Sequence, residues 1–239
     1  NNMSFLILVR HGQSVWNLEN KFTGWVNVDL TEKGKLEAEK AGLLIRNKNL
    51  KIDHFYSSIQ LRAKNTLKII LNVLDEKKKF VSAWQLNERH YGAMTGLNKI
   101  EIGKQIGNDK VKKLRRAWNV RPDPLNRKSQ YHPVNIDIYK EIPQENIPDT
   151  ESLEDTYIRV LKYFTEEIKH KLENQNVLIS AHGNSIRALC KNLFKLDNNK
   201  ISELEIPTGN PLVIKFNNEA TIENCEYLDK DRAKDLLVF

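Results

Sequence analysis

Two short apolar segments of this chain each lead into a histidine that is followed by a glycine. Residues 5–9 form an unbroken apolar run before Arg10-His11-Gly12, and residues 177–179 lie just before Ala181-His182-Gly183. A continuous apolar run bounded by polar residues is typical of a strand that is buried on both faces of a parallel sheet. We therefore expect an α/β protein in which both histidines follow buried strands.

Segments with helical periodicity alternate with the predicted strands. Apolar residues recur at helical spacing in four segments, 31–48, 60–75, 153–172 and 186–193. Further strands are predicted at 54–56, 80–82, 212–216 and 221–227. Thr31 is a residue type that caps helix N-termini. This alternation predicts a three-layer α/β/α sandwich, with a mostly parallel sheet that has an antiparallel strand at its edge.

The length of 239 residues suits a single domain spanning residues 1–239. Between residues 84 and 150 the sequence is rich in proline and polar residues, and only 111–118 has clear helical periodicity. We interpret 84–150 as an inserted helical flap, and 225–239 as a C-terminal tail.

Composition restricts the class of protein. Hydrophobic residues make up 40% and charged residues 29%, and no apolar run has the length of a membrane span. We expect a soluble, cytoplasmic protein with no membrane partner. Cys190 and Cys225 lack a CxxC spacing, which argues against a disulfide framework or a zinc site.

The net charge of +7 favours an anionic partner. Nucleic acid is one alternative, and it predicts binding that weakens steeply with salt. However, lysines alternate with glutamates in 32–48 and 166–171, which is typical of a solvated surface. A small polyanionic substrate explains the charge equally well, and we predict no nucleic-acid partner.

The two histidines are expected to face one cleft, because ligands of open α/β sheets bind beyond the carboxyl ends of the strands. Glycine after each histidine would let the backbone approach a ligand closely. Metal ligation is an alternative, yet no HxH or HExxH spacing is present, and we predict no metal. Neighbouring donors, Arg10, Asn17, Arg62 and Asn184, instead favour phosphate, and histidine can carry a phosphoryl group covalently.

Two further groups complete the predicted chemistry. Glu88 is a candidate acid/base, although it could equally pair with Arg89 on the surface. Lys99, Arg115 and Arg116 form a basic group in the flap that would hold a second anionic group of the substrate. Because adjacent helical residues point about 100° apart, the alternative is that at least one of the two arginines faces solvent.

Four segments, in this order, resemble the cofactor-dependent phosphoglycerate mutases of the histidine phosphatase superfamily. They are residues 8–17 (LVRHGQSVWN), 22–25 (FTGW), 86–92 (LNERHYG) and 181–189, with IPTG at 206–209. The match extends over about residues 4–217. Departures are Gln13, where many members carry glutamate, and the tail, where Asp229 replaces a common glycine.

The resemblance implies that His11 is phosphorylated, that Glu88 is the acid/base, and that His182, Arg10 and Arg62 complete the catalytic set. The implied substrate-binding residues are Arg10, His11, Gly12, Gln13, Ser14, Asn17, Thr23, Gly24, Arg62, Glu88, Arg89, Tyr91, Lys99, Arg115, Arg116, Gly183 and Asn184.

The implied activity is interconversion of 3-phosphoglycerate and 2-phosphoglycerate in glycolysis and gluconeogenesis, primed by 2,3-bisphosphoglycerate. The alternative activities are those of a bisphosphoglycerate mutase or phosphatase, or of another histidine phosphatase. The predicted partners are small-molecule phosphoglycerates, and we also expect a homo-oligomer, either a dimer or a tetramer.

Overall fold

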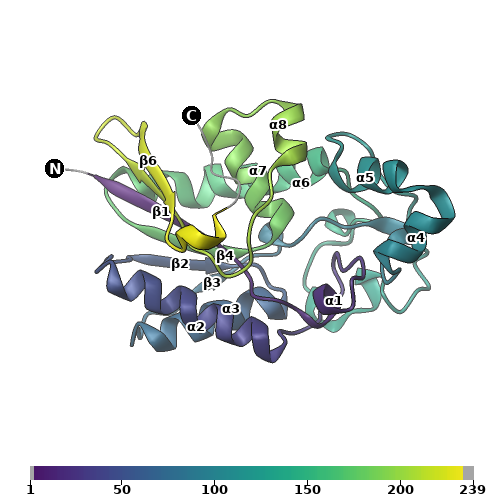
Figure 1. The fold of residues 1–239 in the computed structure, drawn as a ribbon, viewed down its shortest axis with the longest axis horizontal. Helices are drawn as coiled ribbons and strands as arrows, with labels where there is room; N and C mark the ends of the chain where they lie inside the picture. Colours follow the sequence, from purple (N-terminus) through teal and green to yellow (C-terminus); the bar gives the residue numbers. More distant parts are fainter. Residues whose placement is uncertain (1–2, 234–239) are drawn as a thin grey trace.

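A computed structural model describes residues 3–233 of the chain (Figure 1). In this part, one six-stranded sheet has the order β3-β2-β4-β1-β5-β6. The strands are β1 (Ser4–Arg10), β2 (His54–Ser57), β3 (Val81–Ser82), β4 (Val177–Ala181), β5 (Leu212–Phe216) and β6 (Ile222–Tyr227). Each strand overlaps a segment that the sequence predicts as a strand.

The strand directions confirm the predicted, mostly parallel sheet with antiparallel pairing at one edge. β3, β2, β4 and β1 run parallel, whereas β5 is antiparallel to β1 and β6 is antiparallel to β5. The antiparallel strand therefore lies inside the sheet, and β6 forms the edge. The cause is the short connection between β5 and β6, because a hairpin can join only antiparallel strands.

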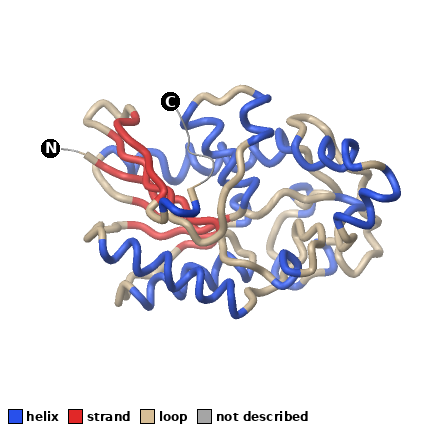
Figure 2. The backbone as a smooth tube through the Cα atoms, in the orientation of Figure 1, coloured by secondary structure: helices blue, strands red, loops and turns tan. Residues whose placement is uncertain are grey.

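Helices cover both faces of the sheet, which confirms the predicted three-layer arrangement. α2 (Glu32–Asn47) and α3 (Leu61–Val73) cover one face, and α6 (Leu153–Tyr163) and α7 (Gly183–Phe194) cover the other (Figures 1 and 2). Side chains of β1 alternate between the two cores: Leu6 and Leu8 pack on the α6 and α7 side, and Ile7 and Val9 pack on the α2 and α3 side. Thr31 caps α2 as predicted, accepting a hydrogen bond from the Gly34 N–H.

Several helices differ from the sequence prediction. The segment predicted as one helix at 153–172 is α-helical only to Tyr163, and continues as a π-helix, Phe164–Ile168, and a 3₁₀ helix, Lys169–Glu173. α1 (Val15–Leu18), α4 (Lys99–Ile106) and α8 (Asn198–Glu203) were not predicted. They are short, and capping by Ser14, Asn98 and Asp197 rather than apolar periodicity marks their starts.

The predicted flap contains α4 and α5 (Asn108–Arg116), which form the end of the molecule farthest from the start of β1 (Figure 1). Two small apolar clusters hold this region, and each takes an aromatic residue from the loop after α1. Phe22 packs with Met94 and Val111, and Trp25 packs with Tyr139. The FTGW segment is thus fixed at both ends. That residues 1–239 form a single domain stays a prediction.

No helix within residues 3–233 is both long enough and apolar enough to cross a membrane.

Candidate active site

The two histidines meet because their strands are neighbours. β1 and β4 are parallel with Arg10 opposite Ala181, and the His11 N–H donates to the Ala181 carbonyl at 3.0 Å. The centres of the His11 and His182 rings lie 5.0 Å apart with the rings tilted by 62°. The two strand ends converge as predicted, but His182 is fully buried and, unlike His11, does not line the cavity.

Hydrogen bonding fixes which nitrogen of His11 is free. Its Nδ1 lies 2.6 Å from the Gly12 carbonyl oxygen, and a carbonyl can only accept, so Nδ1 carries the proton. Nε2 therefore keeps its lone pair. Burial, together with the Arg62 and Arg10 guanidinium groups, lowers the pKa of His11 well below its ordinary value. The ring is neutral, as a nucleophile must be.

His182 is buried beside His11 and is also neutral. Burial and the charge of Arg62 lower its pKa well below the ordinary value. Its Nε2 shares a 2.7 Å hydrogen bond with the Ser58 hydroxyl, whereas its buried Nδ1 has no partner within the described residues.

A cavity of about 580 Å³ opens in front of His11. Most of the predicted site residues line it: Arg10, His11, Asn17, Thr23, Gly24, Arg62, Glu88, Tyr91, Lys99, Arg115, Arg116, Gly183 and Asn184.

Arg62, which is buried, and Arg10, which is half-buried, supply positive charge beside His11, and we call this part of the cavity its inner end. Arg62 is 1% exposed and donates to the carbonyls of Val26 and Gly24, at 2.8 and 2.9 Å. Arg10 donates to the Ile206 carbonyl at 2.8 Å, and its buried Nε has no partner among residues 3–233. Burial lowers the pKa of both guanidinium groups, but carbonyl partners hold them in place without neutralising them.

Gly24 shows why the FTGW segment carries a glycine. Its φ is +54°, and a Cβ there would lie 3.3 Å from both the Arg89 carbonyl oxygen and the Tyr91 nitrogen. The left-handed backbone turns the Gly24 carbonyl towards Arg62 and the Gln60 side chain, which both donate to it.

Glu88 faces the cavity, and its interpretation as a surface partner of Arg89 is wrong. Its Oε1 accepts hydrogen bonds from the backbone N–H groups of Arg89 at 2.7 Å and Asn184 at 3.2 Å. The Arg89 guanidinium is instead buried among backbone carbonyls. These belong to Leu114, Arg115, Val120 and Glu151.

Arg89 therefore does not line the cavity, although it is one of the implied binding residues. It holds the C-terminal end of α5 in place, and so fixes Arg115 and Arg116.

The basic group of the flap lines the cavity as well, and we call the part lined by Lys99, Arg115 and Arg116 its outer end. Lys99 begins α4, and Arg115 and Arg116 end α5; all three line the cavity, so the interpretation that one arginine merely faces solvent is not supported. Burial and the neighbouring Arg115 lower the pKa of Lys99 to about 8. Arg116 donates to the Leu204 carbonyl at 3.2 Å.

Besides Arg89, three implied binding residues lie outside the main cavity. The Gly12 N–H donates to the Thr66 hydroxyl, and the place of a Cβ is occupied by the backbone of Gly34. Gly12 thus allows close packing of the chain on α2, rather than the approach of a ligand. Ser14 is buried and caps α1, with Asn17 completing the capping box. Gln13 lines a smaller adjoining cavity of about 270 Å³.

The cavity residues that were missed as site residues include Arg187, Thr208 and Arg232, and the first two lie in the motifs that carry the family resemblance. Arg187 lies one turn beyond Gly183 on α7 and donates to the Asn184 side-chain oxygen at 2.7 Å. Burial and Arg116 lower its pKa to about 10. Its spacing from the His-Gly pair could have indicated it. Arg232, in the tail, donates to the Thr208 carbonyl at 2.7 Å and lies 3.2 Å from the Glu37 carboxylate.

The tail reaches the cavity because its start is fixed. Asn210 donates to the Asp229 carbonyl and accepts from the Asp229 N–H, both at 2.9 Å, and the Lys40 ammonium pairs with the Asp229 carboxylate at 2.8 Å. The next residues, Lys230–Arg232, form a 3₁₀ turn that brings Asp231 and Arg232 to the cavity rim. Residues 234–239 of the predicted tail lie outside the described residues.

Within the described part of the chain, no group of three or more histidine, cysteine, aspartate or glutamate side chains is arranged to hold a metal ion.

Comparison with known proteins agrees with this architecture. The family model of the histidine phosphatase superfamily (branch 1) matches residues 6–135 and 125–224, and the chain belongs to this superfamily.

A protein from Pelagibacter ubique (strain HTCC1062), named 2,3-bisphosphoglycerate-dependent phosphoglycerate mutase, is 65% identical over 99% of this chain and 100% of its own length. A protein of the same name from Hamiltonella defensa subsp. Acyrthosiphon pisum (strain 5AT) is 45% identical over 93% of this chain and 90% of its own. The crystal structure of a phosphoglycerate mutase from Bacillus anthracis str. Sterne shares the fold, with a TM-score of 0.66 over 95% of this chain and 92% of that one, at 22% identity.

Proposed function

We propose that this enzyme interconverts 3-phosphoglycerate and 2-phosphoglycerate through a phosphohistidine at His11, primed by 2,3-bisphosphoglycerate. The names of relatives that match over nearly the whole chain support this assignment. The observation that carries it is the state of His11: a buried, neutral ring with Nδ1 bound to Gly12 and Nε2 left free, at a cavity lined by arginines. The cytoplasm and glycolysis are the expected setting.

The cavity suits a ligand with negative charge at both ends. Arg10 and Arg62 lie at the inner end, and the buried Arg10 Nε is a donor that lacks a partner within residues 3–233. Lys99, Arg115 and Arg116 lie at the outer end. When bound, 2,3-bisphosphoglycerate supplies the phosphoryl group that primes His11.

The transfer step follows from these positions. His11 Nε2 forms the new bond to phosphorus as the bond from phosphorus to the glycerate oxygen breaks, and Glu88 donates a proton to that departing oxygen. Because Glu88 Oε1 already accepts two backbone hydrogen bonds, we assign the mobile proton to Oε2. Arg10, Arg62, Asn17 and His182 hold the phosphoryl oxygens. In the return step, Glu88 takes the proton from the attacking hydroxyl.

The arginines supply the positive charge that magnesium supplies in many phosphoryl-transfer enzymes. We therefore expect full activity after exhaustive chelation, and strong inhibition by vanadate, which adopts the five-coordinate geometry of in-line transfer. An enzyme that a chelator silences and a divalent ion restores would contradict the proposal.

The decisive test is covalent labelling. Exposure to 2,3-bisphosphoglycerate carrying a labelled phosphate should give an acid-labile, alkali-stable phosphoenzyme, as expected for phosphohistidine, and His11→Ala should give none. Equal labelling of His11→Ala would remove His11 from the mechanism. Labelling without interconversion of the two phosphoglycerates would instead favour a phosphatase of the same superfamily. Assembly into a homo-oligomer stays a prediction, which light scattering can check.

A further inference from the structure

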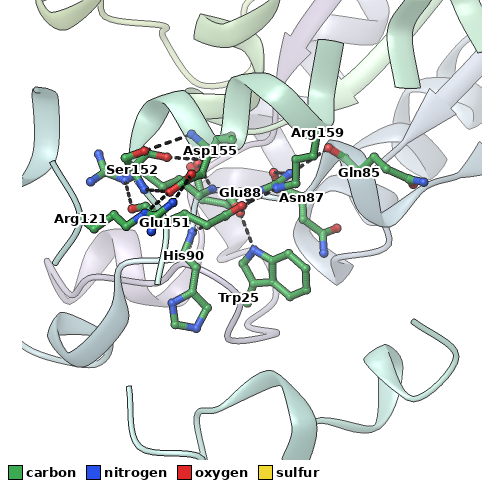
Figure 3. A network of polar contacts seen from close by, with 12 residues as sticks. Trp25, Gln85, Asn87, Glu88, His90, Arg121, Glu151, Ser152, Asp155 and Arg159 are labelled. Atoms are coloured by element: carbon green, nitrogen blue, oxygen red, sulfur yellow. Dashed lines mark hydrogen bonds and ion pairs between the residues drawn. The ribbon is translucent and has the colours of Figure 1, made fainter. Parts of the chain in front are cut away.

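The peptide groups on both sides of Glu88 are held by side chains. The Glu88 N–H donates to Gln60 Oε1 at 2.9 Å. The Glu88 carbonyl accepts from Trp25 Nε1 at 2.7 Å and from the Arg159 guanidinium at 2.8 Å (Figure 3). A carbonyl oxygen has two lone pairs, so both are used. The direction in which Glu88 leaves the backbone is therefore set by three side chains from separate parts of the fold.

Arg159, on α6, makes the largest contribution to this arrangement. It donates to the carbonyls of Gln85 at 2.8 Å and Asn87 at 3.0 Å, in addition to that of Glu88. Its remaining donors bind the two oxygens of the Glu151 carboxylate, at 2.7 and 2.9 Å. All five N–H groups of the guanidinium thus have acceptors, and three of these are carbonyls of the segment that carries Glu88.

Glu151 completes the arrangement from the opposite side. Its Oε1 accepts from the His90 N–H at 2.9 Å, and its own N–H donates to the His90 carbonyl at 3.0 Å. The Arg159 and Glu151 side chains are 11% and 6% exposed. Burying a charged pair is costly, and apolar packing would often serve stability as well. The pair is better explained by the position that it gives to residues 85–90.

We propose that Arg159 and Glu151 are positioning residues for Glu88, which set the place of its carboxylate for proton transfer without touching the substrate. Neither residue is among those that line the cavity in the described part of the chain. The proposal rests on the proposed function, in which Glu88 carries the proton. A displacement of about 1 Å in a reacting group can cost about a hundredfold in rate, so small changes at Arg159 should reach the chemistry.

The first variant is Arg159→Lys, which keeps a positive charge opposite Glu151 but loses the planar fork that reaches three carbonyls. We expect kcat to fall roughly ten- to a hundredfold and KM to change by less than about twofold, because substrate contacts remain.

The matched control is Arg121→Lys. Arg121 donates two hydrogen bonds, of 2.6 and 2.7 Å, to Asp155, which lies on α6 as Arg159 does (Figure 3). However, the Arg121 side chain is 62% exposed, and it makes no hydrogen bond to residues 85–90 of the described chain. Its kcat should stay within about twofold of the parent.

A double-mutant cycle shows whether Arg159 acts through Glu88. If it does, Arg159→Lys should lower kcat by less than about twofold when added to Glu88→Gln, because the carboxylate that it positions is already gone. If the two losses multiply, Arg159 serves the fold alone and the inference is overturned.

Trp25→Phe tests the same atom by a second route, should Arg159→Lys fail to fold. It removes the Nε1 donor to the Glu88 carbonyl while keeping an aromatic ring, and its loss of kcat should also vanish in the Glu88→Gln background. If neither variant changes kcat while Glu88→Gln lowers kcat about 10²- to 10⁴-fold, the positioning inference is wrong and the proton role of Glu88 stands. If Glu88→Gln lowers kcat less than about tenfold, the proton role of Glu88 in the proposed function is wrong, and with it the reason for positioning Glu88.

Discussion

The two ends of the cavity are built in different ways. At the inner end, Arg62 is buried and Arg10 half-buried, both donate to backbone carbonyls, and the rings of His11 and His182 lie in contact at the ends of neighbouring strands. At the outer end, the charges come from the flap, the tail and α7, and Lys99, Arg115 and Arg116 are only half-buried.

This difference matches the two tasks of the proposed reaction. The transferring phosphoryl group needs fixed donors whose geometry does not change during the step. The rest of the substrate must turn over between the two half-reactions, so its anionic groups need positive charge without a single fixed geometry. We therefore expect substitutions at the inner end to lower the rate of phosphoryl transfer. Substitutions at the outer end should instead weaken retention of the bisphosphorylated intermediate in the cavity.

The largest expected effect belongs to Arg62→Ala. This change removes a donor to the phosphoryl oxygens, takes the Arg62 donor from the Val26 carbonyl and leaves the Gly24 carbonyl with Gln60 as its donor. We expect kcat to fall about 10² to 10³-fold, as for loss of one oxyanion donor, with slow phosphoenzyme formation in rapid-quench experiments. Thermal unfolding should show that the variant folds. A loss confined to KM would mean that Arg62 only binds, and the two ends would then not differ in task.

The second prediction compares two glycines. Gly12→Ala would place a Cβ against the backbone of Gly34, which has no room to move because a Cβ on Gly34 would in turn strike Gln13. We expect a loss of about 3 kcal/mol in the free energy of unfolding. Gly103→Ala in α4 meets only the end of the flexible Asn108 side chain, and alanine favours helix. Denaturant titration of Gly103→Ala should show little or no loss in the free energy of unfolding. If the two variants lose equal amounts, the inner end is not the more tightly packed region.

The third prediction concerns retention at the outer end. Arg116→Ala or Arg115→Ala should lower mutase activity more than hydrolysis of 2,3-bisphosphoglycerate, shifting the ratio about ten- to a hundredfold towards hydrolysis, because a charged hydrogen bond contributes about 1.5 to 3 kcal/mol. Lys113→Ala, on the exposed side of α5, is the control. If both activities fall in proportion, the arginines bind substrate without retaining it.

The smallest expected effect is the pH dependence of Lys99. Its pKa of about 8 means that the free enzyme loses this charge as pH rises through 8, so kcat/KM should fall up to about tenfold by pH 9. Lys99→Arg should remove that decline.

Stability should change in the opposite direction. The folded-state pKa of Lys99 lies below its ordinary value of 10.5, so between about pH 8 and 10.5 the unfolded chain binds more protons, and stability rises with pH. An increase of stability with pH is expected for a lysine whose ammonium group is partly buried in the folded chain.

For the activity, one result would contradict the prediction. If the parent and the Lys99→Arg variant have the same pH profile of kcat/KM, a group other than Lys99 titrates.

The same contrast explains what the sequence could predict. The inner end follows from local patterns, because a strand, its His-Gly end and the parallel pairing together place His11 beside His182. The outer end depends on contacts between distant segments. Arg232 reaches the cavity only because Asn210 holds Asp229, and no periodicity or motif in the tail indicates that.

Motif residues were also not all at the ligand cavity. Gly12, Ser14 and Arg89 belong to recognisable motifs, but the structure uses them for packing, capping and support of α5. A motif match does not tell whether a residue binds the ligand or supports the fold, and the packing around the residue in the structure shows which. The sequence does not predict α4 and α8, because a single capping residue marks the start of each helix more clearly than apolar spacing does.

The placement of β1 has a consequence for the synthesis of the protein. Among the described residues, β1 pairs with β4 and β5, which lie in the last third of the chain. At about 5 to 20 residues per second, a ribosome needs roughly 9 to 34 seconds after β1 to complete β4. During that time the apolar strand that ends at His11 has no sheet neighbour, and the second histidine has not been made. The nascent chain is therefore inactive until late, and its first strand is the segment with the greatest need of a chaperone.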